Sequence, residues 1–224
     1  MDITKVSSRK PIRAINFLFG TKAPLCVYRS YIKTFLKRKA ILASAPDISK
    51  FEIDRAEGTF SNDWFKPNIP YWHQVLSQFG FYDREINTLE IGSWEGMSTL
   101  YILSTFPLAK HVSVDTWAGA DEHQGDAVLN SIESNFEGNT KKYKDRLEKF
   151  KGTSFNFFNS VEGQENFDLI YIDGSHHTDD VIVDAIKGFE QLKVGGIMIF
   201  DDYFWVYYKN AIDNPAGAVN AFLS

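Results

Sequence analysis

Two short stretches of the sequence hold side chains that can do chemistry. "YIDGSHHTDD" (171–180) places three acids and two histidines within ten residues, and "FDDY" (200–203) adds Asp201 and Asp202. Such groups can bind a metal ion, exchange protons, cap a helix or form a polar loop. Which of these applies depends on the elements that position them.

From residue 86 onward, short apolar runs alternate with helical patterns. Strands are predicted for "INTLEIG", "HVSVDTW", "FDLIYIDG" and "GGIMIFDDY", with a weaker strand near Phe150, and helices for "GMSTLYILSTF" and "DDVIVDAIKGFEQL". This alternation is typical of an α/β protein with a mostly parallel central sheet and helices on both faces. In such sheets ligands bind beyond the carboxyl ends of the strands. The residues directly after each strand are therefore the candidates for a site.

Glycines follow the first predicted strand and an acid ends the second. Gly92 and Gly96 permit a tight turn, after which the helix directs its free N–H groups toward an anion. Their spacing is not that of the dinucleotide fingerprint, and the absence of a following Gly-Lys-Ser/Thr excludes a P-loop. Asp115 is placed to accept hydrogen bonds from ribose hydroxyls. Trp117 packs either against a base or into the core.

The run "LEIGSWEGMSTL … VSVDTW … FDLIYIDGSHHTDDVIVDAIKGFEQLKVGGIMIFDDY" resembles class I S-adenosylmethionine-dependent methyltransferases. It is most similar to the subgroup related to catechol-type and macrolide-sugar (macrocin-type) O-methyltransferases. The resemblance covers residues 86–224. It implies a Rossmann-like fold, S-adenosylmethionine as cofactor, and methyl transfer to a hydroxyl of a small molecule such as a sugar or secondary metabolite.

The resemblance also assigns cofactor-binding residues. In this assignment Ser98 contacts the methionine carboxylate, Ser154 of "KGTS" the adenine edge, and Asp173 the methionine amino group. The complete set is Glu90, Gly92, Ser93, Gly96, Ser98, Asp115, Trp117, Ser154 and Asp173.

Asp173, Asp201 and Asp202 end neighbouring strands, and such carboxylates repel one another unless a cation lies among them. Their oxygens suit Mg²⁺, so we assign these three residues to a metal site, with a metal-free hydrogen-bonded site as the alternative. The catechol-type enzymes carry asparagine where this chain has Asp202, and a lysine base where it has His176. We assign His176 and Asp173 to catalysis. His176 remains open as base, ligand or hydrogen-bond donor to the acceptor.

Structural roles are expected for the remaining polar residues of this region. Asp179 or Asp180 is expected to cap the following helix, and His177 to be an exposed loop histidine. Asp184 is expected to face solvent or a basic neighbour.

The aromatic segment before the first strand has two interpretations. It either folds over the cofactor and flanks the acceptor, or anchors the N-terminal helices on the sheet; its aromatic residues are Trp64, Phe65, Tyr71 and Trp72. His123, in the loop after the second strand, is a candidate for the border of the acceptor pocket.

Three parts are predicted along the chain: a basic helical extension (1–50), an aromatic-rich lid and helix segment (51–85) and the methyltransferase domain (86–224). Residues 1–40 contain ten cationic residues and one acid, although the whole chain has a net charge of -5. "VYRSYIKTFLKRKAIL" predicts a helix that packs on the domain or contacts an anionic surface, and "SAPDISKFE" predicts a linker.

The acidic balance argues against nucleic acid as a partner, and no apolar run approaches the roughly 20 residues of a membrane span. Cys26 is the only cysteine and no signal peptide is recognisable, so the cytoplasm is the predicted location.

The family's sheet normally ends in an antiparallel hairpin, which is predicted to be missing here because the sequence ends at "NPAGAVNAFLS". An exposed sheet edge and a tendency to form homodimers follow. Two alternatives to the methyltransferase stay open: a metal-dependent hydrolase, and a non-catalytic cofactor-binding or scaffold protein with a docking helix.

Overall fold

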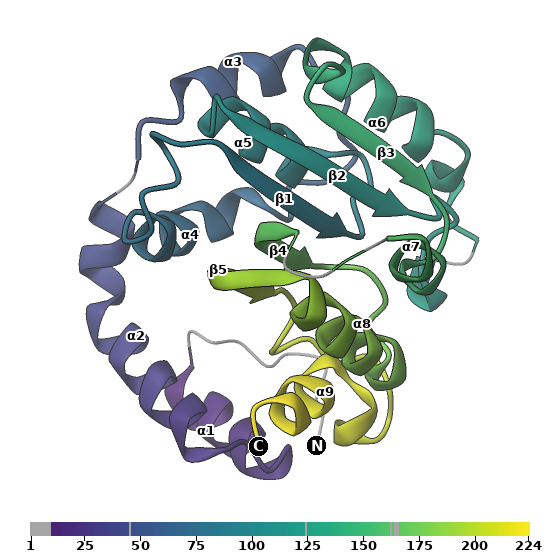
Figure 1. Ribbon diagram of the computed structural model, residues 1–224. Coiled ribbons are helices and arrows are strands. Elements are labelled where there is room, and N and C mark those ends of the chain that lie inside the picture. The colour runs from purple at the N-terminus through teal and green to yellow at the C-terminus, as the bar shows by residue number, and fades with distance from the viewer. Residues whose placement is uncertain (1–9, 45, 124, 162, 164–165) are drawn as a thin grey trace.

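Five strands form one sheet in which every neighbouring pair is parallel. In the order β3-β2-β1-β4-β5 the sheet comprises β1 (Ile86–Ile91), β2 (Ala109–Asp115), β3 (Leu147–Lys151), β4 (Phe167–Ile172) and β5 (Leu192–Phe200). The computed structural model describes residues 10–44, 46–123, 125–161, 163 and 166–224. The arrangement in Figure 1 confirms the predicted Rossmann-like class I methyltransferase fold.

Nine α-helices lie in the described part of the chain. They are α1 (Pro11–Gly20), α2 (Leu25–Ala43), α3 (Ser49–Ala56), α4 (Ile69–Leu76), α5 (Met97–Thr105), α6 (Ile132–Thr140), α7 (Ser154–Ser160), α8 (Thr178–Gln191) and α9 (Pro215–Phe222). The linker prediction for "SAPDISKFE" was wrong in its second half, where α3 begins. Asp47 accepts the Ser49 backbone N–H at 2.9 Å, and Phe51 is buried edge-on against Tyr101. This burial supplies the stabilisation that a linker lacks.

The two faces of the sheet are buried against different helices, as the near-continuous apolar strands predict. Along β4, Leu169 and Tyr171 belong to the core shared with α3, α4 and α5, whereas Ile170 and Ile172 belong to a second core with Phe157 of α7. Alternate residues of a strand point to opposite faces, so an uninterrupted apolar run requires cover on both sides.

Strand order reverses between β1 and β4, and the chain segments that follow these two strands meet there. The backbone N–H of Asp173 donates to the Ile91 carbonyl at 2.8 Å. Gly92 has φ +86°, and a Cβ at this position would lie 2.1 Å from the Asp173 carbonyl oxygen. The contact therefore needs a glycine, and it brings the turn after β1 against the end of β4.

The N-terminal helices lie at the periphery, far from β3 and α6: α1 lies near α9, and α2 runs from α1 along the edge of the molecule to α4 (Figure 1). Phe17 and Leu18 of α1 are buried in a small apolar cluster with Tyr203, Phe204 and Ala216. The helix predicted from "VYRSYIKTFLKRKAIL" is confirmed as α2. The three-part division of the chain remains a prediction, and residues 1–9 of its first part lie outside the described residues.

After β5 the chain forms α9, which packs against α8. The described residues contain no antiparallel strand. Homodimer formation and the cytoplasmic location remain predictions. No helix among the described residues is both long enough and apolar enough to span a membrane.

Candidate active site

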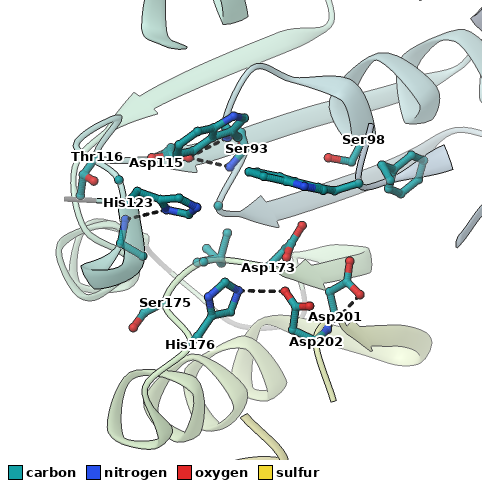
Figure 2. Close-up of a pocket in the computed structure, with 18 of the residues that line it drawn as sticks. Ser93, Ser98, Asp115, Thr116, His123, Asp173, Ser175, His176, Asp201 and Asp202 are labelled. Atoms are coloured by element: carbon teal, nitrogen blue, oxygen red, sulfur yellow. Dashed lines mark hydrogen bonds and ion pairs between the residues drawn. The ribbon is translucent and has the colours of Figure 1, made fainter. Parts of the chain in front are cut away.

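A cavity of about 940 Å³ lies at the carboxyl ends of the strands. The segments that follow β1, β2, β4 and β5 line it, which is where the topology predicts a ligand site. We call the Gly92–Ser98 turn with Asp115 the glycine rim, and Asp173, His176, Asp201 and Asp202 the acid rim. Figure 2 shows Asp173, His176 and Asp202 grouped across the cavity from Ser93 and Asp115.

The glycine rim is held from below by Glu90, which is completely buried at the end of β1. Its carboxylate accepts hydrogen bonds from Ser98 and Thr99 at the start of α5, and His111 lies 3.5 Å away. Desolvation opposes ionisation of Glu90, but His111 and the two hydroxyls outweigh it and lower its pKa. Glu90 thus fixes the start of α5 and does not line the cavity.

Asp115 closes the glycine rim at the end of β2. Its Oδ2 accepts the backbone N–H groups of Ser93 and Trp94 at 2.7 and 2.8 Å, and its Oδ1 accepts that of Trp117 at 2.6 Å. Burial nevertheless raises the pKa of Asp115, against the lowering effect of these N–H groups. The side chain therefore shapes the turn and also lines the cavity, where Oδ1, which accepts one of the three N–H groups, has capacity for a further donor.

The structure divides the nine residues assigned to the cofactor. The six that line the cavity are Gly92, Ser93, Ser98, Asp115, Ser154 and Asp173. Glu90, Gly96 and Trp117 do not. Trp117 packs on Phe136 and donates from Nε1 to the Trp94 carbonyl, which supports the core alternative.

The acid rim concentrates negative charge in a buried place. The Tyr171 hydroxyl lies within hydrogen-bonding distance of carboxylate oxygens of both Asp173 and Asp201. A phenol has one proton to donate, so the second contact requires a protonated carboxyl or leaves two acceptors facing each other. Burial and the charges of Asp201 and Asp202 raise the pKa of Asp173 well above its ordinary value. A cation between the carboxylates would relieve this repulsion.

The residues that can share one ion differ from the predicted trio. Oxygen and nitrogen atoms of Asp173, His176 and Asp202 lie within 4.8 Å of one another. Asp201 is not part of this group, because it turns toward Tyr171 and the side-chain amide of Asn68, which donates to it at 3.0 Å. Asp201 as a ligand therefore stays a prediction, whereas His176 lies where it can act as a ligand, one of the roles left open for it.

His176 is held by two contacts of different kinds. Its Nε2 lies 2.8 Å from Asp202 Oδ2, and its ring packs on Trp205 with centroids 4.3 Å apart. Asp202 itself has φ +54°. This backbone conformation is unfavourable for residues other than glycine, and such residues cluster at functional sites. The strand end therefore orients Asp202 toward the imidazole at the expense of local backbone energy.

The aromatic segment before β1 contributes to both of its predicted roles. Trp64 lines the cavity and stacks on His123 with centroids 5.9 Å apart, and Trp94 approaches His123 at 4.6 Å. Trp72 is instead buried against Tyr171, 4.8 Å between centroids, which fits the anchoring role. Phe65 is buried yet borders the cavity, whereas Tyr71 does not.

Asp184 was expected to face solvent, and this was wrong. It is 2 % exposed and lines the cavity near Ser154. Burial raises its pKa to about 6, although a hydrogen bond from Ser154 acts in the opposite direction. Its helical spacing places Asp184 on the same face as the buried Val181 and Ala185, but an acid without a basic partner is rarely buried, so the sequence favoured solvent.

Three buried polar atoms without a hydrogen-bond partner belong to residues that line the cavity. They are Ser93 Oγ, Trp94 Nε1 and Asp184 Oδ1. Buried polar groups are rarely left unpaired in proteins, so these atoms indicate a bound molecule that completes their hydrogen bonds.

Comparisons with known proteins agree with this geometry. Residues 89–203 match the family described as "Methyltransferase domain". This match extends over half of the chain. The chain belongs to the methyltransferase domain family. Its enzyme class, an S-adenosylmethionine-dependent methyltransferase, is thereby confirmed at the level of family and fold, and the hydrolase alternative loses its support.

Solved structures of methyltransferases share the fold at low identity. The S-adenosylhomocysteine-bound methyltransferase PaMTH1 of Podospora anserina is 18% identical, covers 83% of this chain and 82% of its own, and superposes with a TM-score of 0.52. MycE of the mycinamycin biosynthetic pathway, solved with Mg, S-adenosylhomocysteine and mycinamycin VI, is 17% identical with a TM-score of 0.52. The match covers 80% of this chain and 45% of MycE, less than half of the latter's length. A search of curated proteins by sequence found no match.

The start of α8 corrects another expectation for this methyltransferase. His177 is the N-cap, its Nδ1 lying 3.4 Å from the Asp179 backbone N–H. Asp179 and Asp180 lie in the first turn, and Asp180 accepts a hydrogen bond from Ser175 at 2.6 Å. Both acids still suit the positive end of the helix dipole, which is why the pattern looked like a cap.

Sequence reasoning missed Trp94 and Asn68 as residues of the methyltransferase site. Trp94 has φ +46° and follows Gly92 in a turn whose conformation depends on Asp115. Asn68 reaches Asp201 from 133 positions away. A polar residue in an aromatic segment carries no signal of such a contact, since only the fold brings the two together.

Proposed function

We propose that this protein transfers a methyl group from S-adenosylmethionine to a hydroxyl of a small molecule, such as a sugar or a secondary metabolite, with help from a divalent cation. The observation that carries the proposal is the shared cavity. The glycine rim and the Asp173–His176–Asp202 group line the same cavity, one suited to the cofactor and the other to an acceptor hydroxyl.

On the cofactor side, the unpartnered atoms match the needs of a nucleoside with an amino acid tail. Asp115 accepts hydrogen bonds from the ribose hydroxyls, and Ser93 Oγ adds a group near the same turn. Asp184 with Ser154 presents a buried acceptor that suits an N–H donor such as the adenine amino group. Asp173 faces the methionine amino group.

The acid rim fits a divalent cation by its donor set. Two carboxylate oxygens and one imidazole nitrogen are compatible with Mg²⁺ and suit Mn²⁺ better, because imidazole is a softer ligand than oxygen. The ion would supply positive charge that lowers the pKa of the acceptor hydroxyl. Asp173, His176 and Asp202 would hold it.

The residues of the chain provide alignment and a route for the proton. The acceptor oxygen forms its bond to the methyl carbon as the carbon–sulfur bond breaks, with the three atoms in line, and the sulfonium becomes a neutral thioether. The hydroxyl proton must leave: with the ion bound, His176 is a ligand and the acidified hydroxyl gives its proton to water, whereas in the metal-free alternative His176, oriented by Asp202 and Trp205, accepts the proton as a base. Trp64 and His123 cover the cavity and help to exclude water.

Calorimetric titration with S-adenosylhomocysteine, with and without Mn²⁺ or Mg²⁺, tests this proposal. We expect binding in the micromolar range, and no binding at high micromolar concentration would contradict it. Asp115→Ala should abolish binding, whereas Asp126→Ala, an exposed acid in the loop that follows, should not change it. His176→Ala should retain binding but lose turnover; unchanged turnover would show that His176 is not the base.

A further inference from the structure

The N-terminal helical corner, which we define as residues 10–43, is a region of one charge sign. It comprises α1, α2 and the turn between them. Its sequence contains eight cationic residues and no acidic one: Lys10, Arg13, Lys22, Arg29, Lys33, Lys37, Arg38 and Lys39. Since the net charge of the whole chain is -5, the corner is a basic element on an acidic protein.

Within the described residues, none of these eight cations takes part in an ion pair, and all but the half-buried Arg38 are exposed. Several cations elsewhere in the described residues do form ion pairs. Arg84 and Lys193 share Asp168, and Lys149 pairs with Glu133. The corner therefore presents positive charge that the described part of the protein leaves uncompensated, and charge of this kind attracts an anionic partner.

Large apolar side chains are exposed on the same two helices. Phe19 is 81 % exposed and Leu25 79 %, and these two residues lie on either side of the turn that contains Lys22. On α1, Ile12, Ile15 and Phe19 follow one another at helical spacing and form one exposed stripe. It lies away from the buried Phe17 and Leu18, which attach α1 to the domain.

The first half of α2 repeats this mixture. Leu25, Ile32 and Leu36 are exposed at a spacing that places them on one side of the helix, and Arg29 and Lys33 lie between them. Exposed apolar side chains of this size, interleaved with cations, are typical of helices that lie in the interface of a lipid bilayer.

We propose that the N-terminal helical corner docks on the surface of an anionic lipid bilayer. Phe19 and Leu25 enter the boundary between headgroups and acyl chains, and the cations contact lipid phosphates. Nucleic acid would match the charge but not the exposed Phe19, Leu25 and Leu36, whereas a bilayer accommodates both. The inference concerns an exposed surface outside the lining of the cavity and does not depend on the proposed function.

Vesicle co-sedimentation of the full chain provides the test. We expect binding to phosphatidylcholine vesicles that contain phosphatidylglycerol, little binding to phosphatidylcholine alone, and release by salt. Lys33→Gln with Lys37→Gln should weaken binding by about 25-fold, from about fivefold for each charge lost. Phe19→Ser with Leu25→Ser should weaken it at least about tenfold, because apolar burial is lost.

Matched controls separate a local surface from a general effect of charge or hydrophobicity. Lys141→Gln with Lys144→Gln removes two exposed cations elsewhere, and Leu108→Ser with Val194→Ser removes two exposed apolar side chains. Both control pairs should bind vesicles as the unchanged protein does. Thermal unfolding should be unaffected in all four double variants, since every substituted residue is exposed.

The single cysteine allows docking to be observed directly. Cys26 is exposed on α2 beside Leu25. An environment-sensitive fluorophore attached there should shift to the blue when phosphatidylglycerol vesicles are added. No co-sedimentation with anionic vesicles, equal losses in the control pairs, or an unchanged fluorophore spectrum would overturn the proposal. So would sedimentation velocity showing that the corner variants lose only self-association.

Discussion

The two rims of the cavity handle buried carboxylates in opposite ways. On the glycine rim, Asp115 accepts hydrogen bonds from three backbone N–H groups. On the acid rim, Asp173 and Asp201 converge on a single tyrosine hydroxyl, with Asp202 nearby. One rim stabilises its charge by fixed dipoles, whereas the other leaves its charge to be compensated by a proton or a cation.

This difference indicates which kind of ligand each rim can bind. A carboxylate already held by backbone dipoles keeps a fixed shape and suits a neutral hydroxyl-bearing ligand such as ribose. On the acid rim, only Asp201 accepts a backbone N–H, that of Asp202, among the hydrogen bonds of the described residues, and carboxylates crowded in this way favour a positively charged ligand. Each rim contains a non-glycine residue with positive φ: Trp94 in the glycine rim and Asp202 in the acid rim. The surrounding structure must therefore hold both turns in an unfavourable backbone conformation.

The largest expected effect comes from breaking the junction of the two rims. Gly92→Ala adds a methyl group that would lie 2.1 Å from the Asp173 carbonyl oxygen, in a residue with φ +86°. We expect the free energy of unfolding to fall by about 3–5 kcal/mol, from backbone strain and the forced displacement of β4. Urea denaturation measures this change in the free energy of unfolding.

Gly80→Ala is the matched control. Gly80 also has positive φ, +63°, but a Cβ there would meet no atom within 4 Å. Gly80→Ala should lower the free energy of unfolding only by the backbone strain of a left-handed alanine, about 1–2 kcal/mol. Equal losses for the two variants would show that the close approach to Asp173 is unimportant.

A sharper test of the acid rim compares two adjacent aspartates. Asp202→Asn should lower Mn²⁺ affinity at least about tenfold, because one of three ligands loses its charge. Asp201→Asn should lower it by less than about threefold, because Asp201 faces Tyr171 and Asn68 instead. Titration calorimetry measures the Mn²⁺ affinity of both variants. A larger loss of affinity in Asp201→Asn than in Asp202→Asn would support the trio Asp173, Asp201 and Asp202 predicted from the sequence.

The smallest effect concerns Asp184, which lies between the rims. Its pKa is raised from 3.8 to about 6 by burial, so the folded state binds the proton more tightly than the unfolded state. Stability therefore falls as pH rises from about 4 to 6 and stays lower above that range. Asp184→Asn, which cannot ionise, should be about 1–2 kcal/mol more stable than the unchanged protein at pH 7.5, with little difference at pH 4.

Thermal and urea unfolding at both pH values check this prediction. Asp126→Asn, at an exposed acid, should leave the pH profile unchanged. A variant profile with the same slope between pH 4 and 6 would contradict the assignment of this slope to Asp184.

Local patterns in the sequence carried most of the fold. The strand predictions around Leu89, Val114, Ile170 and Met198 are confirmed. The strand around Ile170 is buried along its whole length, which is why its near-continuous apolar run was a strong signal. The position of the site also followed, because ligands bind where parallel strands end. By contrast, α3 was missed because a helix of eight residues derives its stability from packing, here of Phe51 on Tyr101.

The candidate site was predictable to the level of segments but not of side chains. Trp117 and Asp184 are the clearest cases, since one was assigned to the cavity and lies in the core, while the other was assigned to solvent and lines the cavity. Trp117 has φ +51°, and a turn with positive φ rotates its side chain by an amount that residue spacing does not fix. Asp184 lies on the buried face of α8, where an ionisable side chain is not expected.

The sequence by itself determined the alternation of strands and helices, the glycine turn, and the acids at the strand ends, because these depend on local backbone chemistry and apolar periodicity. Only the tertiary structure decided that His176 joins Asp173 and Asp202 while Asp201 turns to Asn68. Neighbouring strand ends lie side by side, so a single backbone turn such as that at Asp202 decides which carboxylate approaches His176 and which is held by Tyr171 and Asn68.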